Sequence, residues 1–313
     1  MSDSLEVLPR WDAEAITDAL RHGRICKVLD ASAIVGAHRK SLAWKNLKKG
    51  DSDAKVHMPL AAAASFPPAA DWPPVLPVPD LVKNVEAASG HSGLVGLLED
   101  ERLKNPKGPE DLPDTPLHGH LDLNTISEPL KFDGPWKGAL SFLWLGPSGY
   151  YGPGLHADPV DNVLFQLDGT KRVFVYETCY TEKFTFMSWI GFLFGPRLNH
   201  YPIVTQAGAP LHHTFQEMHP ELAKLPYHDV TLEPGQALCL PCGALHAPYG
   251  STRSVSINCF FIGKSYETFM LPWQQKMLFR EKWRNRLRGF FGRYFDCCAK
   301  APYNYQGKVT KLQ

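Results

Sequence analysis

Between residues 139 and 261 the sequence alternates short runs of β-branched and aromatic residues with turn-forming residues, and this succession constrains the fold more than any other feature. The runs that predict strands are ALSFLWL (139–145), NVLFQL (162–167), KRVFVYE (171–177), HDVTL (228–232), QALCLP (236–241) and SVSINCFF (254–261). The sequences GPSG, LDGT, EPGQ and GSTR supply turn signals between them. Short strands without intervening helices are typical of a sandwich, a jelly roll or a barrel and argue against a parallel βαβ sheet. We expect a mainly β fold with flanking helices.

The sequence before these runs predicts a helix, a short strand and an irregular segment. Residues 11–22 have apolar residues at helical spacing, with Asp12 as N-cap and Gly23 as the stop, and Cys26–Leu29 follows as a short strand. Six prolines in the fourteen residues 66–79 favour polyproline II and exclude a regular helix or a central strand.

The chain is expected to divide into three parts without a clean boundary between autonomous domains. Residues 1–137 supply N-terminal helices, strands and proline-rich segments that pack on the barrel. Residues 138–263 form the catalytic core, with an insertion at 178–227 that is either a lid or substrate groove or a hydrophobic cover. Residues 264–313 form a helical extension whose basic, amphipathic stretch is expected to pack on the protein or on a second subunit. A homodimer that forms through this helix is therefore one expected arrangement. Binding of the helix to an anionic membrane or to nucleic acid is the less favoured alternative.

Composition narrows the class of protein. The 313 residues include 33 Lys and Arg against 32 Asp and Glu, a formal net charge of +1, which excludes a strongly cationic nucleic-acid binder as the first interpretation. The longest apolar stretch, residues 184–195, is too short to span a bilayer, and the N-terminus shows no secretory signal. We expect no membrane or nucleic-acid partner and a cytoplasmic protein, with the nucleus as the alternative in a eukaryote. The seven cysteines are expected to be mostly reduced and buried.

Two histidines and an aspartate form a candidate metal-binding constellation. His156 and Asp158 are two residues apart, so on an extended strand both side chains leave the same face. A Pro-Gly turn and an apolar strand lead to His246, which can add a third ligand from a neighbouring strand. Two imidazoles and one carboxylate on one side of a metal leave the opposite positions open, as in non-haem Fe(II) oxygenases. These three residues are the predicted metal ligands and catalytic centre.

Lys171 begins the strand after the first metal motif, and Val173 and Val175 share its face by parity. A lysine on the inner face of an apolar strand is costly unless an anion pairs with it, and a bound dicarboxylate would meet that need. Asn162, six residues after His156, lies between the two motifs and can add a neutral hydrogen bond. The same region therefore predicts a site for a small anionic co-substrate.

Taken together, these motifs resemble the JmjC (cupin-like) family of Fe(II)- and 2-oxoglutarate-dependent oxygenases. The resemblance rests on the HAD motif at 156–158, Asn162, Lys171 in DGTKRVFVY, the phrase EPGQALCLPCGALH ending at His246, and INCFF at 257–261. It points to the hydroxylase branch, which includes the asparaginyl hydroxylase of hypoxia-inducible factor. The similarity is good over about residues 138–262 and loose elsewhere.

The resemblance implies a double-stranded β-helix, a form of jelly roll, in which the three predicted ligands bind Fe(II). Lys171 would hold the distal carboxylate of 2-oxoglutarate, with Asn162 and Asn258 lining the same pocket. The implied reaction consumes O2, hydroxylates a C–H bond of a protein or peptide side chain or of a small molecule, and decarboxylates 2-oxoglutarate to succinate. The sequence does not identify the residues that bind the substrate.

A departure from the family's pattern supports a second interpretation. Many relatives have Thr or Ser three residues before the first metal ligand, where this chain has Pro153, which offers no hydroxyl. The alternative is a non-enzymatic cupin-like module that binds metal but has lost 2-oxoglutarate turnover.

Two further clusters compete with the predicted site. His118, His120 and Asp122 alternate like metal ligands, but they follow a proline-rich loop and lack a PG-strand-His companion, so a loop or substrate-entrance role is preferred. Cys239 and Cys242 form a CxxC motif without a βαβ context or a second CxxC. Packing in the core is therefore preferred to redox chemistry or zinc binding.

Overall fold

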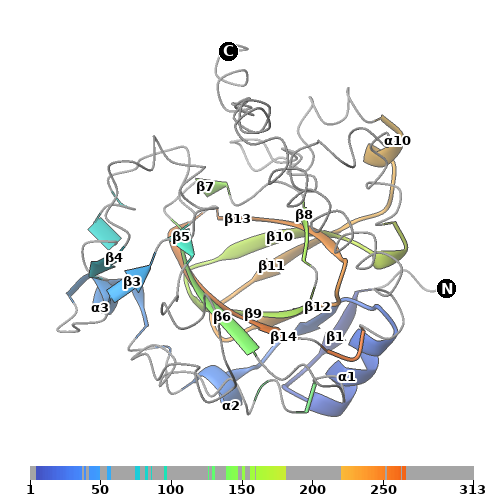
Figure 1. Cartoon of the computed structure of the whole chain (residues 1–313), viewed down its shortest axis with the longest axis horizontal. Coiled ribbons are helices and arrows are strands. Elements are labelled where there is room, and N and C mark those ends of the chain that lie inside the picture. The colour runs from blue at the N-terminus through green and yellow to red at the C-terminus, as the bar shows by residue number, and fades with distance from the viewer. Residues whose placement is uncertain are drawn as a thin grey trace, which may run out of the picture.

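The structure is a computed structural model, and it describes residues 5–36, 39, 42–49, 55–57, 75–77, 82–83, 86, 95–96, 126, 129–130, 139–146, 150–151, 156–158, 160–180, 220–250, 252–261 and 263–265. Within these residues two β-sheets face each other, and the helices α1 and α2 lie on the outer side of the larger sheet (Figure 1). This is the mainly β fold that the strand pattern predicts, in the jelly-roll-like arrangement that the family resemblance implies.

The larger sheet has seven strands in the order β1-β2-β12-β9-β14-β6-β5. Neighbouring strands are antiparallel except for β1 and β2, which are parallel. The strands are β1 (Glu6–Leu8), β2 (Cys26–Val28), β5 (Val95–Gly96), β6 (Ala139–Gly146), β9 (Asp161–Asp168), β12 (Ala237–Leu240) and β14 (Ser254–Phe261).

The smaller sheet is antiparallel and has the order β11-β10-β13-β7, with β8 also paired to β13. Its strands are β7 (Tyr150–Tyr151), β8 (His156–Ala157), β10 (Lys171–Tyr176), β11 (His228–Leu232) and β13 (Leu245–Gly250). The remaining elements are the pair β3 (Lys55–His57) and β4 (Val75–Pro77), the helices α1 (Ala13–Arg21), α2 (Ser32–Val35), α3 (Trp44–Lys49) and α10 (Pro220–Ala223), and a 3-10 turn at Thr178–Tyr180. No helix in the described part of the chain is long and apolar enough to cross a membrane.

The larger sheet is covered on both sides, and side-chain alternation separates two cores. On its outer face Val163 belongs to a cluster that includes Leu20 of α1. On its inner face, which is turned to the smaller sheet, Leu164 packs in a cluster with Val173 and Val175 of β10. Because both faces are covered, β9 is buried along almost its whole length, including its polar residues Asn162 and Gln166.

Helix α1 forms where its sequence predicts it. The Asp12 carboxylate accepts hydrogen bonds from the backbone N–H groups of Glu14 and Ala15, both at 3.1 Å, and so caps the first turn. Beyond the last turn Gly23 has a φ of 67°, a conformation that favours glycine. The apolar side of the helix, with Ile16 and Leu20, is fully buried on the sheet.

All six predicted strands are confirmed, with small differences at their ends. Of residues 66–79 the structure describes only 75–77, the strand β4, which lies in a two-stranded sheet and is therefore an edge strand, as the exclusion of a central strand requires. The polyproline II conformation stays a prediction. Most of the 178–227 insertion, residues 118–122, Pro153 and the segment from 266 onward lie outside the described residues. The three-part division of the chain stays a prediction.

Candidate metal centre

Two of the three predicted metal ligands meet at the inner side of the smaller sheet. His246 on β13 is 6% exposed, and its Nε2 lies 3.5 Å from Oδ2 of Asp158. Its other ring nitrogen, Nδ1, lies 2.9 Å from the backbone oxygen of Ala244. Since a carbonyl oxygen only accepts, Nδ1 donates in this contact, and Nε2 is the ring nitrogen that faces the carboxylate. A nitrogen and an oxygen at this distance can both coordinate one metal ion. A backbone carbonyl that accepts from the other ring nitrogen is the usual support of a ligating histidine.

The backbone brings the third predicted ligand to the same place. His156 on β8 pairs directly with His246 on β13 in the antiparallel register. Directly opposed residues in such a pair have Cβ atoms about 5 Å apart. The side chain of His156 lies outside the described part, and among the described side chains no group of three His, Cys, Asp or Glu is placed to hold a metal ion. The structure therefore brings together Asp158 and His246 by their side chains and His156 by its backbone position.

A tight turn before β13 fixes the backbone of Asp158. The N–H of Gly243 donates to the carbonyl oxygen of Asp158 at 3.0 Å. Gly243 has a φ of 83°, which a side chain would make costly, so glycine is needed at this point of the turn. The turn then leads directly to His246, so one short segment positions both predicted ligands, Asp158 and His246.

An amide relay holds the Asp158 carboxylate from the larger sheet. Asn162 on β9 donates from Nδ2 to Oδ2 of Asp158 at 3.2 Å, and Asn258 on β14 donates from Nδ2 to Oδ1 of Asn162 at 3.0 Å. The ionised carboxylate can only accept, so it sets the orientation of both amides. Asn258 is 4% exposed, and its Oδ1 has no hydrogen-bond partner in the described structure. Asn258 Oδ1 is therefore an acceptor next to the site, and a hydrogen-bond donor of a ligand or a water can bind to it.

Lys171 lies on the same inner face of β10 as Val175, the residue paired with His246. Its side chain is 1% exposed, and its ammonium contacts the hydroxyl of Ser256 on β14. Burial lowers the pKa of Lys171 to about 7. An anion bound beside it would favour the charged form and raise that pKa. Lys171 and Val175 are four residues apart on one strand, so their Cα atoms are about 13 Å apart.

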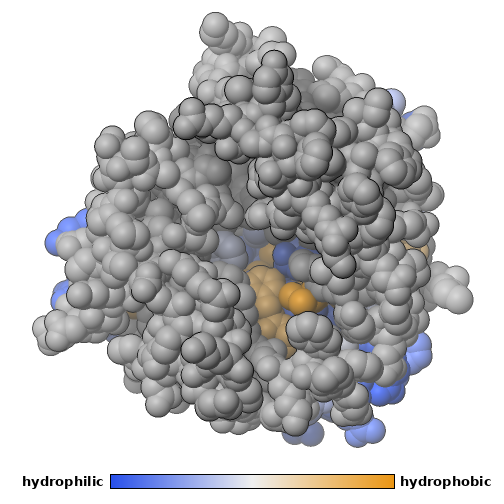
Figure 2. All heavy atoms as spheres, in the orientation of Figure 1, coloured by the Kyte–Doolittle hydropathy of each residue, from blue (hydrophilic) through white to orange (hydrophobic). Residues whose placement is uncertain are grey.

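The interior between the sheets is visible from one face of the molecule. Figure 2 shows a hollow near the centre of this face, in which apolar side chains lie beside hydrophilic ones among the residues drawn in colour. In the orientation of Figure 1 this hollow lies over the space between the two sheets.

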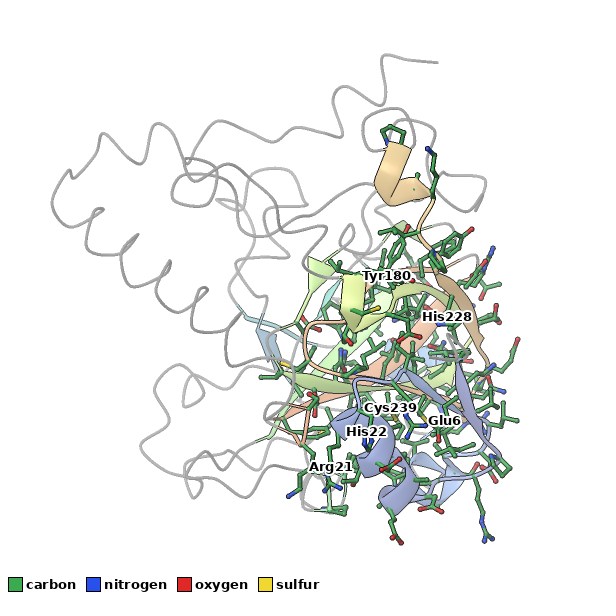
Figure 3. All side chains as sticks on the ribbon, turned by 90° about the vertical axis from the view of Figure 1, so that its right-hand side faces the viewer. Glu6, Arg21, His22, Tyr180, His228 and Cys239 are labelled. Carbon is green, nitrogen blue, oxygen red and sulfur yellow. The ribbon has the colours of Figure 1, made fainter. Side chains whose placement is uncertain are left out.

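The CxxC motif belongs to the packing, as predicted. Cys239 on β12, labelled in Figure 3, is fully buried and pairs in register with Cys26 of β2, and Cys242 is 1% exposed. All the described cysteines are free thiols. Burial raises the pKa of the Cys242 thiol well above its usual value, so the reactive thiolate is disfavoured.

Sequence reasoning misses two titratable groups near the site. Asp161, the first residue of β9, is fully buried, and burial raises the pKa of its carboxyl to about 7. His228 on β11, labelled in Figure 3, pairs with Val175, so one strand separates it from His246; its Nε2 lies 2.7 Å from Oε1 of Glu177. The only sequence signal for Asp161 is a charged residue at the start of an apolar strand. The pairing of His228 with Glu177 links residues 51 positions apart and leaves no local signal.

Comparison with known proteins agrees with this architecture. Residues 85–266, more than half of the chain, match the family described as the cupin-like domain. A stretch of 115 residues is 32% identical to Lysine-specific demethylase 8 of Xenopus tropicalis. That stretch covers 37% of this chain and 23% of the relative, so the similarity extends over less than a quarter of the relative's length. The family match covers more than half of the chain, including all the predicted ligands, and shows that the chain belongs to the cupin-like domain family.

Proposed function

We propose that this protein is an Fe(II)- and 2-oxoglutarate-dependent oxygenase that hydroxylates a C–H bond of a protein or peptide side chain or of a small molecule. The observation that carries the proposal is the approach of His246 Nε2 to Asp158 Oδ2 at 3.5 Å, with His156 opposite in the register. A cupin-like chain with this combination has the donor set that suits non-haem Fe(II).

The proposed role of His156, Asp158 and His246 is to hold the metal, while the remaining groups position what binds beside it. When bound, Fe(II) with 2-oxoglutarate supplies the oxidation by O2, in which 2-oxoglutarate is converted to succinate and CO2. The Ala244 carbonyl orients His246, and Asn162 orients Asp158. The chain's contribution is thus to fix the ligands before the metal arrives.

Lys171 is proposed to bind the distal carboxylate of 2-oxoglutarate, with the Ser256 hydroxyl beside it. Support comes from its burial and lowered pKa, since a carboxylate would offset the cost of a buried ammonium. Asn258 is proposed to line the same pocket through its free acceptor oxygen, which takes a donor such as a bound water. Asn162 contributes through Asp158, because its amide donates to that carboxylate.

The name of the matched relative specifies removal of methyl groups from lysine. Demethylation of this kind begins with hydroxylation of the methyl group, so the two outcomes share the same first oxidation and differ in the substrate. Hydroxylation is proposed here because the resemblance of the motifs points to the hydroxylase branch, and the relative is matched over 23% of its length.

The test is anaerobic addition of 2-oxoglutarate to the Fe(II)-loaded protein while the visible charge-transfer band of the chelate is recorded. We expect a band in the wild type, no band in His156→Ala, and a much higher 2-oxoglutarate requirement in Lys171→Ala. Val163→Ala is the matched control, because Val163 is buried on the opposite face of the larger sheet. Oxygen-dependent succinate release and a product with one added oxygen by mass spectrometry complete the assignment.

The alternative is a metal-binding cupin-like module without turnover, and Pro153 in place of a hydroxyl-bearing residue favours it. This module would bind metal but give no charge-transfer band. It would also gain no thermal stability from 2-oxoglutarate, whereas a protein that binds the co-substrate is stabilised by mass action.

A further inference from the structure

A buried carboxylate lies directly behind the candidate metal centre, on the other side of strand β9. Asp161 has the parity of Val163, which packs on the outer face of the larger sheet, whereas Asn162 belongs to the inner face. Asp161 is 0% exposed. It therefore cannot touch a ligand in the interior between the sheets, and its effect on the site must pass through the backbone.

The Asp161 carboxylate joins three segments of the chain. It accepts hydrogen bonds from the backbone N–H of Cys242 at 2.7 Å, from the backbone N–H of Ser265 at 3.4 Å and from the Ser265 hydroxyl. The backbone of Gly263 passes so close that a Cβ built there would lie 1.9 Å from Asp161 Oδ2. The chain after β14 is thus shaped around this carboxylate.

Two of these segments carry the predicted ligands. Asp161 follows Asp158 by three residues, and Cys242 precedes His246 by four. Neighbouring N–H groups of the turn hold both ends of the segment from Asp158 to Asp161. Cys242 N–H donates to the Asp161 side chain, and Gly243 N–H donates to the Asp158 carbonyl oxygen. Two hydrogen bonds in tandem fix the distance and the angle between the strands better than either bond does alone.

We propose that Asp161 is a positioning residue for the metal centre, which holds Asp158 and His246 in their relative place through the turn at residues 241–244. The inference rests on the proposed function. A buried carboxylate costs folding free energy unless it is fully hydrogen-bonded, and an apolar residue would serve packing on this face better. Its retention there is explained by the link that it makes between the two ligand-bearing segments.

The experiment is a calorimetric titration of the metal-free full-length protein with Mn²⁺, well below the melting temperature of every variant. Asp161→Ala is compared with Val163→Ala, which removes buried atoms from the same strand and face but no hydrogen bond to the turn at residues 241–244. We expect Asp161→Ala to weaken Mn²⁺ binding roughly tenfold to a hundredfold, as loss of a ligand's support does, and Val163→Ala to change it by less than about twofold. The visible bands of the Co²⁺-loaded protein should shift in Asp161→Ala and stay unchanged in Val163→Ala.

Two further variants keep the test decisive. Asp161→Asn retains an oxygen that can accept from Cys242 N–H, so it should recover most of the lost affinity. If Asp161→Ala gives no folded protein, Ser265→Ala replaces it, because it removes one donor to the carboxylate and should weaken Mn²⁺ binding severalfold.

The outcomes separate this inference from the proposed function. Wild-type affinity and an unchanged Co²⁺ spectrum in Asp161→Ala, or in Ser265→Ala where that variant takes its place, would overturn the positioning role while leaving the proposed metal site intact. If Asp161→Asn binds Mn²⁺ as weakly as Asp161→Ala, the loss of affinity comes from the lost negative charge and not from the lost hydrogen bonds. This result would also overturn the positioning role. A wild-type protein that binds no Mn²⁺ would overturn the metal site, and the inference with it.

Discussion

Strand β14 presents opposite chemistry on its two faces, although both faces are buried. Its outer side carries Val255, Ile257, Cys259 and Phe261, which pack in the cluster beneath the helices. Its inner side carries Ser254, Ser256, Asn258 and Phe260, of which the three polar residues are at most 4% exposed. In an ordinary two-layer protein a polar stripe faces water. Here the polar stripe faces the other sheet, and this difference supports the proposed ligand site on the inner face.

Removal of a ligand on the inner face should give the largest effect on binding. His246→Ala should reduce Mn²⁺ binding below detection, because it deletes the ring whose Nε2 faces Asp158. Its melting temperature should fall less than that of outer-face variants. Calorimetric titration with circular dichroism melting checks both, and unchanged Mn²⁺ affinity would contradict the division between the faces.

Removal of a large outer-face side chain should give the largest effect on stability. Phe165 is fully buried, and its ring stacks on Trp11 with centroids 5.6 Å apart. Phe165→Ala should lower the free energy of unfolding by about 3–5 kcal/mol, measured by urea denaturation. Mn²⁺ affinity of the folded variant should match the wild type, and a parallel loss of affinity would show that the faces are not independent.

The buried ionisable groups of the two faces should respond to pH in opposite ways. Burial lowers the pKa of Lys171 from 10.5 to about 7, so between these values the unfolded state binds more protons and stability rises with pH. Burial raises the pKa of Asp161 from 3.8 to about 7, so between these values the folded state binds more protons and stability falls as pH rises. Together the two groups predict a stability minimum near pH 7.

Substitutions of Lys171 and Asp161 distinguish the rise in stability above pH 7 from the fall in stability below pH 7. Lys171→Met should flatten the rise above pH 7, and Asp161→Asn should flatten the fall below it, each by at most about 1.4 kcal/mol per pH unit. Urea unfolding of the metal-free protein across pH measures both slopes. If neither substitution changes the dependence of the unfolding free energy on pH, burial does not shift the pKa values of Lys171 and Asp161.

The smallest effect is expected far from both cores. Asp12→Ala removes the cap of α1 and should cost about 1 kcal/mol of stability. Asp12→Asn is the matched control, since its side-chain oxygen can still accept from the first turn. Mn²⁺ affinity should be the same in all three proteins, and equal stability of the alanine and asparagine variants would contradict the capping role.

The sequence predicts the strands well because each is encoded locally, by β-branched and aromatic residues between turn signals. It does not predict β13, although this strand carries His246, because Pro248 interrupts the pattern of a central strand. The alternation in SVSINCFF predicts the strand but not its double burial, since covering of the polar side depends on a sheet formed elsewhere in the chain.

The candidate site, like the fold, has features that the sequence predicts and features that it does not. The ligand spacing and Lys171 follow from short motifs and strand parity. The link from Asp161 to Cys242 and Ser265 spans 81 and 104 residues. The orientation of the Asn162 amide depends on the Asp158 carboxylate that it meets, and that of the Asn258 amide depends on Asn162. Such contacts are set by tertiary packing and leave no local pattern.

Strand β8 has a kinetic consequence for the proposed metal site. In the described structure it is two residues long and pairs with β13 alone, yet it carries the position of His156. Local opening of so short a segment costs far less than global unfolding. The rate at which a metal enters and leaves is therefore expected to follow the detachment of β8, so exchange can be fast in a protein whose cores stay closed.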